Sequence, residues 1–403
     1  NGYSSVFAEI NGFGNDAVKS DMQLLYKGGD GFRQNNDFDQ VNGTIKSHFF
    51  LSDRKILNVK ANVNFENSKA TYTGLTEYSF ATDPNFNPKE DDNFKVFRTS
   101  LDVLYTNEIT RNLTGNTTVY MSYFDRRWWR EDDIFVRPSS LESGNLTAVP
   151  YFMTSDLVRV GNGQSNFGIL RTFYVGGAEQ NYTFQHESGE FRAGIRGHWE
   201  RFIDDKKVGD VPDARDGVYF TGSEDDPTIV GQSHHYETVA LSLYLQEQYE
   251  RGQLTLSPGL RFELFRQDQV NRLRGSILSD KVTYVLLPGL GINYAVGDYN
   301  LFGGIHRGYT PPSSGTLRVT NFGQDVNSGG LDLKAEKSWN MEAGLRTWRS
   351  GLRLEIAGYW IKINDLVAAG RGTAFKNLGK VQTYGVEAGG SMVLSRYAKA
   401  LPD

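Results

Sequence analysis

Cysteine is absent from the 403 residues, which excludes both disulfide frameworks and thiolate metal sites. No run approaches the roughly 20 consecutive apolar residues that a membrane-spanning helix needs, so helical insertion is excluded as well. The formal net charge of -5 gives no basic excess of the kind that binds nucleic acid, and no nucleic-acid partner is expected. Glycine, tyrosine and phenylalanine are abundant instead, with 44, 21 and 25 residues, which favours strands and turns over helices.

Strict alternation of apolar and polar residues is clearest at residues 57–65, where every second side chain is apolar. The same period recurs around residues 113–123, 191–200 and 239–245. Several of these segments approach the roughly 10 tilted residues that cross a bilayer as a strand. A mean hydropathy of -0.48 agrees with such a wall, because only half of each strand in a membrane barrel faces lipid. The sequence therefore predicts an all-β, transmembrane antiparallel β-barrel.

The connections between these segments alternate between short and long, as the periplasmic turns and extracellular loops of an outer-membrane barrel do. The short connections fall at 12–15, 52–55, 107–112, 187–190, 251–252, 296–298 and 349–351. The long ones fall at 28–37, 66–95, 128–165, 204–236, 266–280, 310–336 and 364–380. A soluble β-sandwich does not require short and long connections to alternate in this way. We therefore expect the bacterial outer membrane as the location.

Counting the segments gives about fifteen strands, an odd number, whereas single-chain bacterial barrels have an even number. An open edge in lipid would leave backbone groups unpaired at several kcal/mol each. We therefore expect residues 1–403 to be part of a barrel whose complete form has further strands, with sequence missing at both ends.

A motif late in the chain resembles the segment Leu-x-Pro-Glu-x-Ser-x-Asn-x-Glu-x-Gly of TonB-dependent receptors. The matching positions are Leu333, Glu336, Ser338, Asn340, Glu342, Gly344 and Arg346. Ala335 stands where the family usually has proline. Residues 306–312 resemble the family's aromatic-x-Pro segment, and residues 383–387 its strand signature, in the same order along the chain. Within the family, residues 74–98 are similar to a long loop of ferric dicitrate receptors.

This resemblance implies a 22-stranded barrel with an N-terminal plug that contacts the TonB-ExbB-ExbD complex, and neither the plug nor the last strands is expected within this chain. It also implies energised uptake of a ferric chelate, with ferric citrate or another siderophore as the cargo, and no enzyme activity or cofactor. The charged motif residues Glu336, Glu342 and Arg346 are interpreted as lumen-facing groups that pair with the plug or with neighbouring strands. A passive porin and a receptor for a nutrient without iron remain alternatives.

Anionic ferric chelates need arginine, whose planar fork matches carboxylates, beside aromatic walls that exclude water. The candidate ligand-binding residues are Arg126, Arg127, Trp128, Trp129, Arg130, Arg137, Arg171 and Arg318, with Arg159 as a further arginine. The competing interpretation is that the arginines at 126–130 bind lipopolysaccharide phosphates or solvate the membrane rim.

The remaining polar clusters are not expected to form a binding site. His234 and His235 are predicted to be loop histidines, because adjacent strand residues point to opposite faces and no third metal ligand lies nearby. Acidic pairs at 91–92, 132–133, 204–205 and 225–226 lack the alternating oxygens of a calcium loop, and we predict solvated loop tips. No metal site is expected. No Gly-x-Ser-x-Gly or comparable nucleophile signature of a barrel hydrolase is present.

Overall fold

The structure is a computed structural model that describes residues 2–71, 73–150, 156–209, 233–272, 275–311, 334–368 and 376–396. Within these ranges fifteen strands form one antiparallel sheet in which each strand bonds its neighbours in chain order. The strands are β1 (Ser4–Gly14), β2 (Val18–Gly29), β3 (Phe38–Ser52), β4 (Lys55–Ser68), β5 (Asn93–Glu108), β6 (Leu113–Val136), β7 (Val158–His186), β8 (Gly189–Gly209), β9 (Ser233–Arg251), β10 (Leu254–Asn271), β11 (Ser276–Val296), β12 (Tyr299–Thr310), β13 (Glu336–Arg349), β14 (Leu352–Asn364) and β17 (Lys380–Met392).

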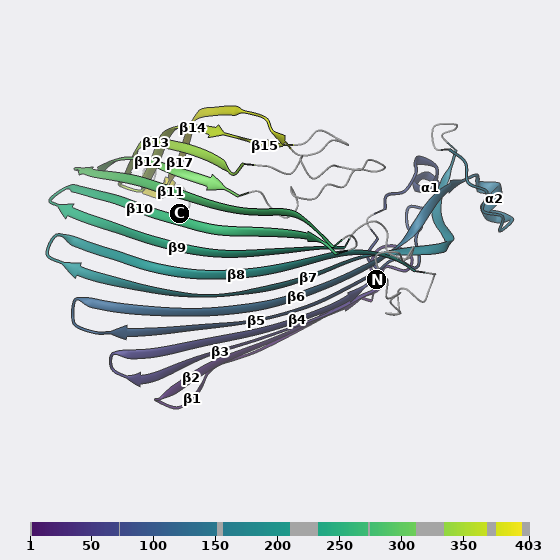
Figure 1. Cartoon of the computed structure of the whole chain (residues 1–403), viewed down its shortest axis with the longest axis horizontal. Helices are drawn as coiled ribbons and strands as arrows, with labels where there is room; N and C mark the ends of the chain where they lie inside the picture. The colour runs from purple at the N-terminus through teal and green to yellow at the C-terminus, as the bar shows by residue number, and fades with distance from the viewer. Residues whose placement is uncertain are drawn as a thin grey trace.

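The remaining elements are short. A separate two-stranded sheet pairs β15 (Val367–Ala368) with β16 (Lys376–Asn377), and the helices are α1 (Glu77–Thr82), α2 (Pro138–Glu142) and a 3-10 turn (Leu394–Arg396). No helix in the described ranges has the length and apolar character to cross a membrane. The predicted all-β antiparallel fold is confirmed. The sheet curls into a trough with the tight turns gathered at one end, and α1 and α2 lie beyond the other (Figure 1).

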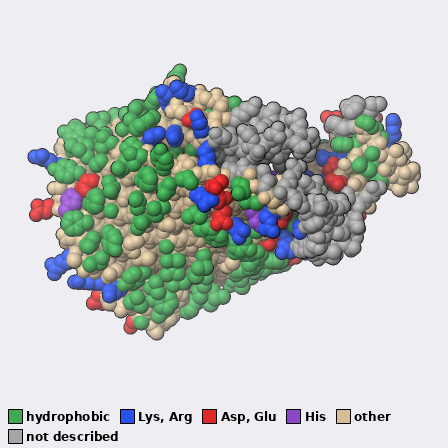
Figure 2. Space-filling model, viewed as in Figure 1, with side chains coloured by type: hydrophobic (Ala, Val, Ile, Leu, Met, Phe, Trp, Pro, Cys, Tyr) green, Lys and Arg blue, Asp and Glu red, His purple; other side chains and the backbone are tan. Residues whose placement is uncertain are grey.

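The two faces of the sheet differ in polarity because side chains alternate along each strand. On β9, Val239, Leu241, Leu243 and Leu245 are exposed on the outer face, while Ser242 between them is buried and bonds Glu263 of β10. Figure 2 shows hydrophobic side chains spread over the outer wall. We call this surface the apolar band. It faces away from the polar concave side of the trough.

The apolar band ends at a definite level on β6. Its exposed outer residues Val119 and Met121 are followed by Tyr123, and then by Asp125 and Arg127, which form an ion pair at 3.1 Å. The parts of β6 and β7 beyond Asp125 therefore lie outside the band.

The strands run further than the sequence predicted. Residues 128–165, 204–236 and 266–280 were expected to be long loops, but β6 continues to Val136, β7 begins at Val158, and only four residues join β10 to β11. His234 and His235 also lie in strand β9 and not in a loop. Past the apolar band a strand no longer needs an apolar face, so backbone pairing continues through sequences that lack alternation.

The extended hairpin packs against the described part of the loop between β4 and β5. Val136, Val158 and Val160 are buried there, and Tyr78 and Phe86 of the loop pack on them. We call residues 73–92, 129–136 and 158–168 together the head. Asn87 also donates to the carbonyl of residue 35 at 3.0 Å, which ties the head to the loop between β2 and β3.

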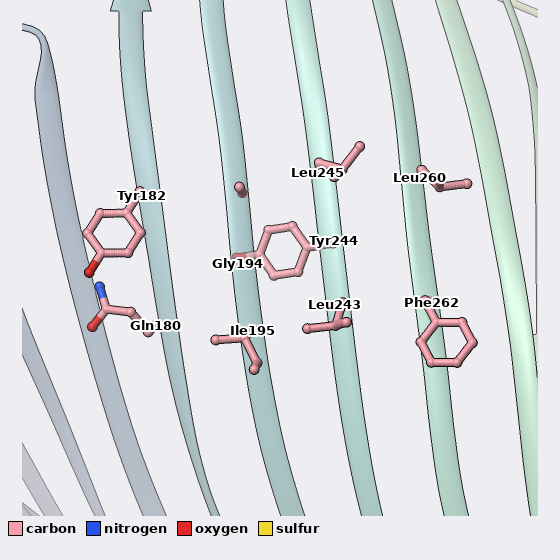
Figure 3. Close-up of a pocket in the computed structure, with 10 residues that line it drawn as sticks. Gln180, Tyr182, Gly194, Ile195, Leu243, Tyr244, Leu245, Leu260 and Phe262 are labelled. Carbon is pink, nitrogen blue, oxygen red and sulfur yellow. The ribbon is translucent and has the colours of Figure 1, made fainter.

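Several glycines pair directly across the sheet with an aromatic residue whose ring covers them. Gly194 of β8 pairs with Tyr244 of β9, and a Cβ atom at Gly194 would lie 2.4 Å from that ring (Figure 3). Tyr120 covers Gly177 in the same way, with its hydroxyl 2.3 Å from the Cβ position. These pairs fix the register of the wall, since the ring fits only where the side chain opposite is missing.

Candidate functional site

The five residues 126–130 lie within strand β6, just beyond the apolar band. Alternation places Arg126, Trp128 and Arg130 on the concave face, and Arg127 and Trp129 on the other. Arg127 is the outer arginine that pairs with Asp125. Trp129 is 2% exposed, and its ring occupies the space above Gly168, its partner on β7. Three of the five predicted residues therefore share the inner surface.

Strand register brings Arg171 to this inner surface. Arg126 of β6 stands directly opposite Arg171 of β7, and Arg171 stands opposite Asp204 of β8. Arg171 Nε and Asp204 Oδ1 form an ion pair at 3.0 Å, with the Asp204 side chain fully buried. The Nε of Arg126 is buried and has no hydrogen-bond partner among the described residues.

Aromatic rings surround these cations on the same face. The Arg126 and Arg130 guanidinium carbons lie 5.8 and 5.2 Å from the centre of the Trp128 ring, and Arg130 also lies 4.8 Å from Phe167. The edge of Phe94 meets Trp128 at 5.7 Å between ring centres. Such contacts hold a guanidinium in place against the face of the ring.

A ladder of four aromatic side chains lies one step deeper in the trough. Phe124, Phe173, Phe202 and Tyr236 occupy directly paired positions on β6, β7, β8 and β9. Phe173 stacks on Phe202 at 4.2 Å and Phe202 on Tyr236 at 5.3 Å between ring centres. We call Arg126, Arg130, Arg171 and Asp204, which lie above the ladder, the charged row. The ladder and the charged row together form the inner wall.

The charged row has an excess of positive charge. Lys206, beyond the apolar band on β8, joins Arg126, Arg130 and Arg171. Burial and the positive charges of Arg130 and Arg171 lower the pKa of Lys206. Asp204 is the carboxylate in this row, so the row presents a positive potential to the mouth of the trough, which suits an anion.

Other predicted ligand residues lie elsewhere. Arg137 is exposed and precedes α2 at the tip of the hairpin. Arg159 pairs with Asp133 inside the head. Arg318 lies outside the described residues, and so does Leu333 of the motif.

The other motif residues line one face of β13. Glu336 Oε1 accepts the N–H of Val367 at 2.7 Å, and Arg346 lies 3.7 Å from the Glu355 carboxylate of β14. Gly344 lies under the Phe302 ring, with 2.4 Å from its Cβ position to the ring. The remaining polar members are Ser338, Asn340 and Glu342, of which Asn340 donates to Ser338 Oγ at 3.0 Å.

The sequence interpretation missed Asp204, Lys206 and the aromatic ladder. The pair 204–205 was predicted to be a solvated tip, which is wrong for Asp204 because its strand continues into the inner wall. The prediction is also wrong for Asp92, which is 1% exposed within the head, and for Asp133, which is half-buried in ion pairs. Matching residues across strands would have required the pairing register, which no single segment contains.

One apolar hollow of about 430 Å³ lies on the outer wall, within the apolar band. It is lined mainly by outward-facing residues, among them Tyr182, Ile195, Leu243, Leu245, Leu260 and Phe262 (Figure 3). Its lining offers no charged group, so it is unsuited to an anionic ligand, and the candidate site remains the inner row.

The long antiparallel strands, apolar outer face and polar inner face define the wall of a β-barrel. Residues 11–399 match the family model described as TonB dependent receptor-like, beta-barrel, and the chain belongs to this family of receptors and transporters.

Solved structures agree in fold. The ferric citrate transporter FecA in its unliganded form is 17% identical with a TM-score of 0.74, over 99% of this chain and 54% of that one. The ferric yersiniabactin receptor FyuA from Yersinia pestis is 14% identical with a TM-score of 0.67, over 96% and 57%. The copper transporter OprC is 14% identical with a TM-score of 0.67, over 97% and 58%. The chain therefore spans a little over half the length of these proteins.

Proposed function

We propose that this chain is the greater part of the barrel of an outer-membrane receptor for TonB-energised uptake of an anionic ferric chelate, with ferric citrate as the first candidate. The supporting observation is the row of Arg126, Arg130, Arg171 and Lys206, which faces the inside of the trough beside Trp128. Clustered arginines of this kind bind carboxylates through charge-assisted hydrogen bonds. Similarity to a ferric citrate transporter supports the same cargo.

The complete protein would bind TonB-ExbB-ExbD through a plug segment, and its apolar band would contact outer-membrane lipid and lipopolysaccharide. The barrel wall supplies ligand recognition and no covalent chemistry, so we propose that the protein is not an enzyme and needs no cofactor.

Uptake of radiolabelled ferric citrate by cells that express the full-length receptor, with and without TonB, tests this proposal. We expect uptake that disappears without TonB. Uptake that does not depend on TonB would indicate a passive porin. Uptake of another nutrient but not of ferric citrate would indicate a receptor with a different cargo.

Arg126→Ala is expected to weaken binding of ferric citrate about tenfold, because a hydrogen bond to a charged group contributes about 1.5–3 kcal/mol. The measurement is a titration of the purified full-length receptor with ferric citrate. Arg127→Ala is the matched control, since this neighbouring arginine points outward to Asp125. Equal losses in both variants would contradict an inner-face site.

A further inference from the structure

Three residues with buried, oxygen-bearing side chains lie in the head. Asp92 is 1% exposed, Glu131 is 4% exposed and Asn166 is fully buried. Oδ1 and Nδ2 of Asn166 have no hydrogen-bond partner among the described residues, and Asp92 Oδ2 has no hydrogen bond within 3.5 Å, although the Thr71 side chain interacts with the Asp92 carboxyl. A buried polar group without a partner costs about 1–3 kcal/mol, so such a group indicates an interaction that is missing from the polypeptide alone.

Strand pairing and two hydrogen bonds bring these three residues together. Glu131 of β6 and Asn166 of β7 are directly paired, so their side chains lie on the same face of the hairpin. Asp92 Oδ1 accepts the backbone N–H of Glu131 at 2.9 Å. Glu131 Oε2 in turn accepts the N–H of Asp91 at 3.2 Å, so the loop and the hairpin hold each other in register.

Basic side chains in the head are directed to a different carboxylate. Lys89 Nζ pairs with Asp133 Oδ1 at 2.6 Å, and Arg159 pairs with the other oxygen of Asp133. In the ranges that the structure describes, neither Asp92 nor Glu131 forms an ion pair within 4.0 Å. Lys89 and Arg130 offset the charge of Asp92 from further away.

Burial without a counterion disfavours the charged form of both acids. Glu131 lies beyond the apolar band, next to the acidic residues Glu90 and Asp91. The head thus concentrates negative charge where water is excluded, and a buried charge needs a partner or a metal ion.

We propose that the head binds a Ca²⁺ ion through the carboxylates of Asp92 and Glu131 and the amide oxygen of Asn166. Ca²⁺ takes six to eight oxygen ligands in irregular geometry, and water or backbone carbonyls complete such a set. Mg²⁺ requires near-ideal octahedral geometry and is expected to bind less well. No group of three or more His, Cys, Asp or Glu side chains in the described part of the chain is arranged for a metal, so the third protein ligand here is an amide.

The bound ion would connect the loop that carries Asp92 to the hairpin that carries Arg130, one residue before Glu131. With only two carboxylates, the site belongs to the weak class of extracellular Ca²⁺ sites, with Kd values of about 10⁻⁴–10⁻³ M. This role is independent of which cargo the receptor takes.

Calorimetric titration of the full-length, EDTA-treated receptor with CaCl₂ tests the proposal. We expect saturable binding that Glu131→Gln weakens at least about tenfold, since this change removes one of the two charged ligands. Asp132→Asn is the matched control, because Asp132 is the next residue along β6 and its side chain is exposed, so binding should be unchanged. Absence of saturable binding, or equal binding in Glu131→Gln and the parent, would overturn the proposal.

Asn166→Ala provides a second variant that changes no charge, so that a folding defect in Glu131→Gln does not decide the result. We expect it to weaken Ca²⁺ binding severalfold. Tb³⁺ offers an independent readout, because Trp129 lies two residues from Glu131 on the same face and would sensitise the emission of a bound ion. Excess Ca²⁺ should displace the bound Tb³⁺ and so lower this emission. Emission that does not fall when Ca²⁺ is added in excess would contradict the assignment.

Discussion

Arg171→Met should lower the free energy of unfolding by about 3 kcal/mol, because it removes the ion-pair partner of a fully buried carboxylate. Asp204 is 0% exposed and lies 3.0 Å from Arg171 Nε. Methionine keeps much of the packing volume and cannot offset the charge. Urea unfolding of the refolded full-length barrel measures the loss.

Two further variants separate the charge effect from packing. Arg127→Met removes a partly exposed pair with Asp125 and should cost about 0–1 kcal/mol. Combining Arg171→Met with Asp204→Leu should recover most of the stability, since the double variant removes both charges of the buried pair. A loss from Arg171→Met no larger than that from Arg127→Met would show that the inner ion pair does not stabilise the wall.

The second large effect is expected from Gly194→Val. A Cβ atom at this position would lie 2.4 Å from the Tyr244 ring, and the two methyl groups of valine would add to the overlap. Overpacking of this kind typically costs about 1–3 kcal/mol, and we expect the upper end because the strand cannot move away without losing its ladder. Denaturant unfolding gives the value.

Gly197→Val is the matched control on the same strand. Nothing lies within 4 Å of its Cβ position, so valine there should leave the stability nearly unchanged. Tyr244→Ala should relieve the effect of Gly194→Val by removing the ring. If the two glycine variants lose the same stability, the cost comes from strand propensity and the aromatic contact is irrelevant.

Periodicity within single segments was enough to predict the wall. The alternation at residues 57–65 falls within β4, and the alternating lengths of the connections predicted which turns gather at one end. Both signals are local, since a side chain's face depends only on its position along its own strand. The family could also be predicted from a local signal, because motif residues such as Glu336 and Gly344 lie within one short segment of the sequence.

The inner site depended on information that a single segment does not carry. Arg126 and Arg171 were both predicted as ligand residues, yet their alignment with Asp204 depends on how three strands are offset. A shift of one residue would have placed Arg171 on the outer face. The burial of Asp92 could not be predicted from the sequence either. An acidic pair in a polar loop has the same composition whether it is exposed to solvent or covered by a hairpin.

A bulge in the β6–β7 pairing, where four residues of β7 (162–165) stand against one residue of β6 (132), separates the hairpin into two independent registers. From Leu113 to Glu131 each step along β6 matches one step along β7, and between Glu131 and Asp133 the pairing shifts. Below the bulge, an inserted residue would turn every inward side chain outward at once, so that stretch should change only by substitution. Above it, the hairpin tip at residues 137–150 can gain or lose residues without disturbing the wall, which makes it the natural place for evolution, or for an engineered surface tag, to alter the outermost part of the receptor.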